Sequence, residues 1–330
     1  MKEFIEKLLK GKSLRQGEMS EIFSRFAEFN VEQKAAFLVL LQQKGESVAE
    51  ILGARNALIK ASTLIPNQHD AIDIVGTGGD SKGTFNISTA ASLILASCKV
   101  KVAKHGSRAQ TSVTGSLDVA EKLGIPIPKT IEEAAMQLKA HNYAYLGGAL
   151  FNQQLKEVAS LRRNLGIPLI FNILGPLLNP VEPTRMVMGV FNLMLVNVVA
   201  KVMQKLKLKD AFVVHGHSGI DEFSLTGPSI YAELRAGKIY RGELNLAEVG
   251  LKPCRLSSLV GGNVNENVLL LKKILYGEIE GPKLDIVLLN VAAGLLVSKK
   301  VTSFKEGVEV AKNAVLSGQT KEFYLSLRGS

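Results

Sequence analysis

Apolar side chains recur three and four positions apart from Lys2 to about Ser62. The residues with this spacing are Ile22, Phe23, Phe26, Phe29, Ala36, Phe37, Leu40 and Leu41. A period near 3.6 gathers such residues on one face of a helix, so the pattern predicts amphipathic helices. It stops at Leu64-Ile65-Pro66-Asn67. We therefore expect a small, mostly helical N-terminal domain over residues 1–65.

Beyond this break, short β-branched runs alternate with helical patterns. The candidate buried strands are residues 71–75, 100–103, 143–146, 211–214 and 286–289. Strands that alternate with helices form mainly parallel sheets. We expect an α/β domain over residues 66–330, with a mainly parallel central sheet flanked by helices. Ligands of such sheets bind beyond the carboxyl ends of the strands, so function should lie in the loops that follow them.

The segment from Asn164 to Thr184 contains four prolines. Proline removes a backbone donor and clashes inside a helix, so a rigid crossing segment is expected here rather than one long helix. We interpret it as a connection between the domains. The region near residues 164–184 is expected to complete the helical domain.

Composition and charge narrow the class of protein. The chain has 330 residues, of which 46% are hydrophobic and 21% charged, as in a folded globular protein. Its net charge of +10 favours anionic partners without choosing among metabolites, nucleic acid and membranes. The longest apolar stretch, Met186 to Ala200, is shorter than the roughly 20 residues of a membrane span, so no membrane partner is expected. Cys98 and Cys254 stand far apart, which indicates a reducing compartment and predicts a cytoplasmic protein.

A glycine-rich loop follows the first predicted strand. Gly76-Thr77-Gly78-Gly79-Asp80 leads through Thr84 to Asn86-Ile87-Ser88-Thr89, which opens the next predicted helix. Glycines let backbone amides approach an anion, and a helix N-terminus offers unpaired N–H donors. The loop therefore predicts a bound phosphate, although turn glycines and a helix cap would explain the same residues. It matches neither a dinucleotide fingerprint nor a Walker A loop.

Cationic and hydroxyl side chains follow the second strand. Lys104-His105-Gly106-Ser107-Arg108 is followed by hydroxyl residues that include Ser112 and Ser116. Lysine offers a point charge and arginine a planar fork, and both suit phosphate, although either could lie in solvent. Two such loops on neighbouring strands favour the anion site. His105 is well placed, but a single histidine after a strand is often only a structural donor.

Adjacent acids follow a later strand. Asp221 and Glu222 come after a flexible turn, in a chain otherwise poor in acidic clusters. Mg²⁺ prefers carboxylates, waters and substrate phosphates, so these acids predict a magnesium site beside the phosphate. Solvated turn acids are the alternative. His215 and His217 alternate like strand residues, but no third histidine or cysteine lies at convincing zinc spacing.

Several motifs in series closely resemble the anthranilate phosphoribosyltransferase family. They are GTGGD with NIST, KHG with TGSLD, RRNLGIPLIFNILGPLLNP and GIDEFSLTGP. The resemblance runs from the N-terminal helical region, including Gln42 to Ser47, to Gly227 and more weakly beyond. It implies transfer of a phosphoribosyl group from 5-phosphoribosyl 1-diphosphate to anthranilate in tryptophan biosynthesis, with two Mg²⁺ ions and a homodimer.

The resemblance also assigns roles to residues. The donor would be held by Gly76, Gly79, Asp80, Thr84, Asn86, Ile87, Ser88, Thr89, Lys104 and Ser116. We expect Gly106, Ser107, Arg108 and Ser112 to bind substrate as well. Ser88 and Glu222 would bind one Mg²⁺, and Asp221 with Glu222 the second. Arg162 would face the anthranilate carboxylate, and Lys104, His105 and Arg162 would act in catalysis.

Three positions depart from the family pattern. Ser107 replaces an asparagine, Asn152-Gln153-Gln154-Leu155 replaces a His-Pro-Ala-Met run, and Pro168-Leu169 replaces an Arg-Thr pair. All three are expected near the acceptor, so a related aromatic or heterocyclic acceptor is an alternative. A pyrimidine nucleoside phosphorylase is disfavoured by the loop after Lys104-His105. A nucleic-acid-binding relative is disfavoured because the phosphate loop is retained, so nucleic acid is an unlikely partner.

Overall fold

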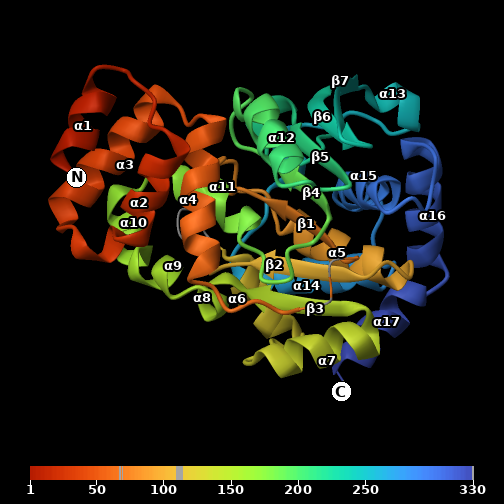
Figure 1. Ribbon diagram of the computed structural model, residues 1–330. Helices are drawn as coiled ribbons and strands as arrows, with labels where there is room; N and C mark the ends of the chain where they lie inside the picture. The colour runs from red at the N-terminus through yellow and green to blue at the C-terminus, as the bar shows by residue number, and fades with distance from the viewer. Residues whose placement is uncertain (67, 69, 109–113, 329–330) are drawn as a thin grey trace.

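The computed structural model of the chain describes residues 1–66, 68, 70–108 and 114–328. A bundle of helices at the N-terminus stands beside a larger unit in which helices cover a central sheet (Figure 1). The N-terminal helices are α1 (Lys2–Leu9), α2 (Gln16–Ser24), η1 (Phe26–Glu28), α3 (Val31–Lys44) and α4 (Val48–Lys60). The predicted fold class, helical domain plus α/β domain, is confirmed.

The sheet has seven strands within the described residues, in the order β3-β2-β1-β4-β5-β6-β7. The strands are β1 (Ile72–Gly76), β2 (Val102–Gly106), β3 (Tyr143–Gly147), β4 (Arg185–Gly189), β5 (Asp210–His215), β6 (Ser229–Arg235) and β7 (Lys238–Leu244). β1 to β5 are parallel, and β6 and β7 add an antiparallel hairpin at one edge. The parallel part brings the carboxyl ends of β1, β2, β4 and β5 to one edge of the sheet.

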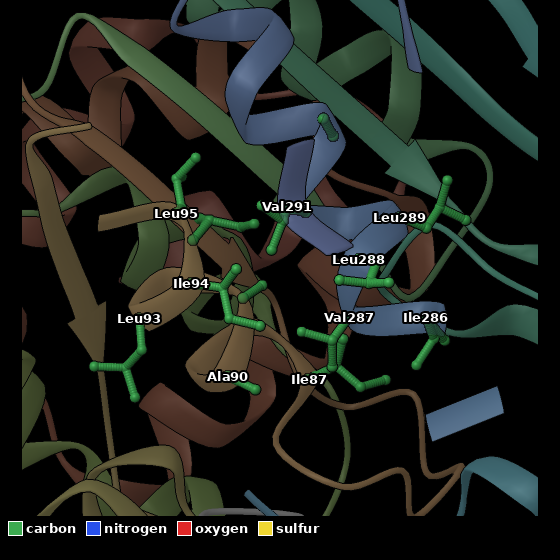
Figure 2. Packing of buried hydrophobic residues seen from close by; sticks show 14 of the residues in the cluster. Ile87, Ala90, Leu93, Ile94, Leu95, Ile286, Val287, Leu288, Leu289 and Val291 are labelled. Carbon is green, nitrogen blue, oxygen red and sulfur yellow. The ribbon is translucent and has the colours of Figure 1, made fainter. Parts of the chain in front are cut away.

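Four of the five predicted strands are present, and the fifth prediction is wrong. Residues 286–289 lie inside helix α15 (Pro282–Val297), and nearly all residues of this helix are buried. A short apolar run reads the same in a buried strand and a buried helix. Pro282 at the first turn, and an apolar run that continues to Val297, mark the longer element as a helix. Figure 2 shows its side chains packed against α5 (Ile87–Ser97).

Further helices cover the sheet or extend the N-terminal bundle. They are α6 (Ser116–Leu123), α7 (Ile131–His141), α8 (Gly148–Phe151), α9 (Gln153–Glu157), α10 (Ala159–Leu165), α11 (Ile170–Leu177), α12 (Leu195–Lys205), η2 (His217–Gly219), α13 (Leu246–Val249), η3 (Leu256–Leu259), α14 (Val264–Leu275), α16 (Phe304–Leu316) and α17 (Gln319–Arg328). None of the helices in the described part of the chain is both long and apolar enough to span a bilayer.

The proline-containing segment holds the short helix α11, which follows α10, and both helices pack with the N-terminal bundle. Phe171 of α11 lies 5.7 Å from Phe23 of α2 between ring centroids, inside one buried apolar cluster. Asn152 adds a polar link, because its Nδ2 donates to Leu58 O at 3.0 Å and to Ser62 Oγ at 2.7 Å. On these contacts we propose that the helical domain ends near residue 65 and is completed by the segment near residues 164–184.

Two acids are buried where α3 turns into α4. Glu50 is fully buried, and its carboxylate accepts from Leu14 N–H, Ser47 N–H and Lys44 Nζ at 2.8, 2.8 and 2.9 Å. Glu46 lies beside it and is also buried. Burial, with the nearby charge of Glu50, raises the pKa of Glu46 to about 7. Glu50 has the hydrogen bonds that a buried carboxylate needs. Glu46 is buried beside that charge, so its ionisation lowers the stability of the folded protein.

We expect Glu46→Gln to be more stable than the unchanged protein at pH 8. A folded-state pKa above the unfolded value means that the folded chain binds more protons, so stability falls as pH rises from about 4.5 to about 7. The free energy of unfolding in urea should differ by about 1–3 kcal/mol at pH 8, and by little at pH 4.5. The exposed Glu21→Gln is the control, and an equal gap at both pH values for Glu46→Gln would contradict the assignment.

Candidate functional site

The three loops singled out in the sequence meet at the carboxyl edge of the parallel strands. The first follows β1, the second follows β2, and the third follows β5, two strands from β1 across β4. The first and third loops touch, because Gly78 N–H donates to Asp221 Oδ2 at 2.6 Å. Thr77 fixes the intervening strand, since its N–H donates to Gly189 O at 3.0 Å and its Oγ1 accepts from Phe191 N–H. The predicted juxtaposition of the loops is therefore present.

Gly76 is required by this junction. The Asp221 carboxylate occupies the place where a side chain at residue 76 would begin, with Cγ 2.8 Å from the position of a Cβ. Gly79 follows in a left-handed conformation with φ 78° and packs against Pro168 and Asn172 of the crossing segment. Asn172 Nδ2 also donates to Thr77 O at 3.2 Å. The glycine loop thus lies between the acidic loop and α11.

Polar atoms in the first loop are buried without a hydrogen-bond partner among the described residues. They are Asp80 Oδ2, Asn86 Oδ1 and Thr89 Oγ1. Asn86 precedes α5 but makes no side-chain cap, so the helix N-terminus keeps its unpaired donors. The far end of the loop is fixed, because Thr84 pairs with Val260 and Gly261 N–H donates to Gly83 O. The free N–H groups of α5 and the Thr89 hydroxyl suit an anion, whereas the Asp80 and Asn86 oxygens are acceptors and suit hydroxyl groups of a ligand.

Asp221 and Glu222 are crowded with Asp80 at the sheet edge. Burial and the charge of Asp80 raise the pKa of Asp221 to about 7. Burial and the charge of Asp221 raise the pKa of Glu222 well above its ordinary value, although Ser88 N–H donates to that carboxylate. Solvated turn acids would show no such shifts, so that interpretation fails here. A cation between these oxygens would relieve the repulsion.

Lys104 is a buried cation on the neighbouring strand. Its side chain is 1% exposed, its Nζ donates to His105 O at 2.8 Å, and it lies 5.9 Å from the Tyr145 ring centroid. Burial lowers the pKa of Lys104, while the charges of Asp73, Glu222 and Asp221 raise it. The cation and the acids therefore share one electrostatic environment at the loop junction.

His105 lies on the opposite face of β2 from Lys104. Its N–H donates to buried Asp73 at 3.1 Å, and its Nε2 is buried without a partner among the described residues. Burial and the charge of Lys104 lower the pKa of His105 to about 4, so the ring is neutral at physiological pH. Its Nε2 lies 2.9 Å from where a Cβ on Gly148 would stand. His105 is thus more than a satisfied structural donor.

The second loop brings only part of its predicted set to the site. Gly106 and Ser116 lie together, with Ser116 Oγ 2.8 Å from where a Cβ on Gly106 would stand. Arg108 instead points along α6, where it pairs with Asp118 and lies 2.7 Å from Glu121, and it is 57% exposed. These two acids hold its guanidinium away from the first loop. Ser107 is exposed at the loop entrance, and Ser112 lies outside the described residues.

Arg162 lies on α10 at the boundary with the helical bundle. Its guanidinium is 5.8 Å from the centroid of Phe171, and burial lowers the pKa of Arg162 to about 10. In the described part of the chain it forms no ion pair with an acid. A desolvated guanidinium beside an aromatic ring suits an aromatic carboxylate. The first glycine loop is linked to this region through the contact of Gly79 with Pro168.

Sequence reasoning missed residues that hold the site in place. Asn290 of α15 is fully buried, and its Oδ1 accepts from Phe223 N–H while its Nδ2 donates to Phe223 O, each at 3.0 Å. It therefore fixes the residue after Glu222, so the C-terminal third does support the site. Asn179 likewise donates to Asp73 at 2.9 Å. The only signal in the sequence was a single asparagine within an apolar run.

The oxygen-rich junction fits a magnesium ion bound together with phosphate. Ser88 at the start of α5, Asp221 and Glu222 offer hard oxygen ligands, and the crowded acids favour a divalent cation. No group of three or more His, Cys, Asp or Glu side chains arranged to hold a metal occurs within residues 1–66, 68, 70–108 and 114–328. His215 and His217 contact Val190 O and Thr226 respectively. Mg²⁺ typically keeps waters and substrate oxygens, so this donor set suits it.

Comparisons with known proteins cover nearly the whole chain. The model of the glycosyl transferase family a/b domain matches residues 68–321, and that of its helical bundle domain matches residues 2–62. Anthranilate phosphoribosyltransferase of Petrotoga mobilis is 42% identical, over 96% of this chain and 92% of the relative. That of Pelotomaculum thermopropionicum is 40% identical, over 96% and 93%.

Solved structures agree with the sequence relatives. The Thermus thermophilus anthranilate phosphoribosyltransferase superposes with a TM-score of 0.89 at 34% identity, covering 99% of this chain and 98% of that one. The Saccharomyces cerevisiae enzyme in complex with PRPP and Mg gives 0.88 at 27% identity, covering 99% and 96%. The chain therefore belongs to the anthranilate phosphoribosyltransferase family.

Proposed function

We propose that the chain transfers the 5-phosphoribosyl group from 5-phosphoribosyl 1-diphosphate to the amine of anthranilate. The products are N-(5-phosphoribosyl)anthranilate and diphosphate, as in tryptophan biosynthesis. The observation that carries the proposal is the junction of Gly78, Lys104 and the Asp221–Glu222 pair at one sheet edge. Backbone amides, a buried cation and paired acids together suit a sugar that carries phosphates at both ends.

The donor is held by groups from the first two loops. Backbone amides of the glycine loop and the N-terminus of α5 bind phosphate oxygens, and the unpaired oxygens of Asp80 and Asn86 suit ribose hydroxyls. Lys104 balances the charge of the diphosphate, with Ser116 on its far side. Arg108 supports α6 and has no direct role, since Asp118 and Glu121 engage it.

The main requirement of the reaction is to stabilise the negative charge that develops on the diphosphate as it leaves. The bond from the anomeric carbon to the diphosphate oxygen breaks with its electron pair leaving on oxygen, and the amine nitrogen forms the new bond to carbon. Ser88, Asp221 and Glu222 would hold magnesium, which would supply neutralising charge to the leaving group. Lys104 stabilises the same departing charge through the low-dielectric interior. We include two ions in the proposal because the two acids and Ser88 can serve two positions.

The acceptor side uses the other face of β2. Arg162 binds the anthranilate carboxylate, and neutral His105 accepts a hydrogen bond from the amine through its free Nε2. With a pKa of about 4, His105 orients the amine rather than removing its proton early. An aromatic amine is nearly neutral and loses its proton after attack, so no strong base is required. We place the enzyme in the cytoplasm, because Cys98 and Cys254 are both free thiols, and we propose a homodimer, as the family resemblance implies.

A related aromatic acceptor is the second candidate, and Asn152 favours it. Its side chain is fully engaged by Leu58 O, Ser62 Oγ and Leu155 N–H, so it has no free group for an acceptor. A set of aromatic amines, with and without a carboxylate, tests both candidates by diphosphate release. Protein that releases no diphosphate from the donor with any of them, in the presence of Mg²⁺, would refute phosphoribosyl transfer.

We expect the double variant Asp221→Asn with Glu222→Gln to lose turnover by roughly 100-fold or more, because the charge that binds magnesium is removed. The urea unfolding midpoint at pH 8 should stay the same or rise, since two acids that ionise at a loss of stability are neutralised. Glu243→Gln on the edge strand is the control. Unchanged turnover in the double variant would remove these acids from the metal site.

We expect Arg162→Ala to raise the KM for anthranilate about tenfold or more, because the substrate carboxylate loses its charged partner. The KM for the phosphoribosyl donor should change little. The adjacent and exposed Arg163→Ala is the matched control. Steady-state kinetics with anthranilate and with aniline, which lacks the carboxylate, isolate the contribution of that carboxylate. An equal rise in KM with aniline would contradict a carboxylate-binding role.

A further inference from the structure

Two hydroxyl groups are buried beneath the phosphate loops without a hydrogen-bond partner among the described residues. They are Tyr145 OH on β3 and Thr89 Oγ1 in the first turn of α5, and both residues are fully buried. Buried hydroxyls are nearly always paired, because an unmet hydrogen bond in a low-dielectric interior destabilises the fold. Such atoms at a site mark a place where a ligand atom completes the pairing.

The phenol of Tyr145 reaches the second phosphate loop through the space that Gly106 leaves. Its Cζ lies 2.7 Å, and Ser116 Oγ 2.8 Å, from where a Cβ on Gly106 would stand. Ser116 is the first residue of α6, and its hydroxyl already donates to Ser107 O at 3.4 Å. Tyr145 OH is therefore placed between the N-terminal turns of α5 and α6.

The chemistry of this position suits a phosphate oxygen. Burial raises the pKa of Tyr145 far above its ordinary value, so the phenol is a hydrogen-bond donor at every physiological pH. Lys104 Nζ lies 5.9 Å from the centroid of the same ring. The two helix N-termini contribute unpaired N–H donors and partial positive charge. The Tyr145 hydroxyl lies near those of Ser116 and Thr89, and each of the three can donate. Because Lys104 and the two helix N-termini add positive charge, the ligand that suits this position is an anionic acceptor.

We propose that Tyr145 is a further binding residue for the phosphoribosyl donor, and that its O–H donates to a phosphate oxygen held between α5 and α6. Thr89 Oγ1 binds the same phosphate from the side of α5. The inference rests on the proposed function, because the phosphate belongs to the donor substrate. That phosphate is either the diphosphate or the 5-phosphate, and inorganic diphosphate and ribose 5-phosphate separate the two sources.

Tyr143 supplies a matched control on the same strand and the same face of the sheet. It is equally buried, but its OH lies 3.2 Å from Ser92 Oγ, which itself donates to Thr89 O. Removal of the Tyr143 hydroxyl therefore breaks a hydrogen bond of the ligand-free protein. Removal of the Tyr145 hydroxyl takes away only its weaker contacts with the Ser116 and Thr89 hydroxyls, which fall outside strict hydrogen-bond geometry.

The first measurement is urea unfolding without ligand. Tyr143→Phe should lower the unfolding midpoint, whereas Tyr145→Phe should leave it unchanged or raise it. A fall for Tyr145→Phe equal to that for Tyr143→Phe would show that the phenol already has a partner in the ligand-free protein, which would overturn the inference.

The second measurement is calorimetric titration of each protein with inorganic diphosphate and with ribose 5-phosphate in the presence of Mg²⁺. Tyr145→Phe should raise the Kd of one of the two ligands about tenfold and change the Kd of the other by less than about twofold, as expected for the loss of one hydrogen bond to a charged group. Tyr143→Phe should bind both ligands as the unchanged protein does. The KM for the phosphoribosyl donor should rise in Tyr145→Phe while the KM for anthranilate stays the same.

Two negative outcomes have different meanings. If the protein without substitution binds the ligands and Tyr145→Phe binds both with the same affinity, only the role of Tyr145 is overturned. Unchanged protein that binds neither ligand and releases no diphosphate from the donor would refute the proposed function, and this inference with it.

Discussion

The electrostatics of the sheet edge constrain the rest of the structure. Lys104 is almost completely buried, and Asp221 and Glu222 lie close enough to raise its pKa against the effect of burial. The acids in turn repel one another and Asp80, so their own pKa values rise. Such a cluster loses stability in isolation and gains it when a divalent cation and a polyphosphate enter together. The site is therefore organised around charges that the substrate and its metal complete.

The fold keeps these charges together by fixing the backbone around them. Parallel pairing brings the ends of β1, β4 and β5 to one edge, and Gly76 leaves space for the Asp221 carboxylate. Asn290, from a helix more than sixty residues further along the chain, holds Phe223 by both backbone groups. Backbone amides fixed in this way bind an anion without reorganisation, which is the main source of electrostatic stabilisation in a closed site.

The sequence predicts the parts of this site that have a local signature. Glycines after an apolar strand and polar residues at a helix start identify the first loop, and adjacent acids identify the third. Residues 286–289 were misassigned because a buried helix and a buried strand share the same apolar run. Strand β4 was hidden inside the stretch from Met186 to Ala200 for the same reason. Asn290 and Tyr145 have no local pattern, because the residues that they face, Phe223 and Gly106 respectively, lie in distant parts of the chain.

The proposed donor and acceptor sides depend on different kinds of structure, and two of the three departures from the family pattern, at residues 152–155 and 168–169, fall on the acceptor side, whereas Ser107 follows β2. The donor cradle consists largely of backbone groups whose positions the parallel sheet dictates, so a change there disturbs the fold. The proposed acceptor side lies on α8 to α11, outside the sheet, where side chains rather than backbone define the surface. Asn152 illustrates the difference, because it links α4 to α9 through its own side chain. Substitutions in α8 and α9 can therefore change the acceptor surface while the phosphate cradle stays intact, whereas Pro168 packs against Gly79 and so belongs to both sides.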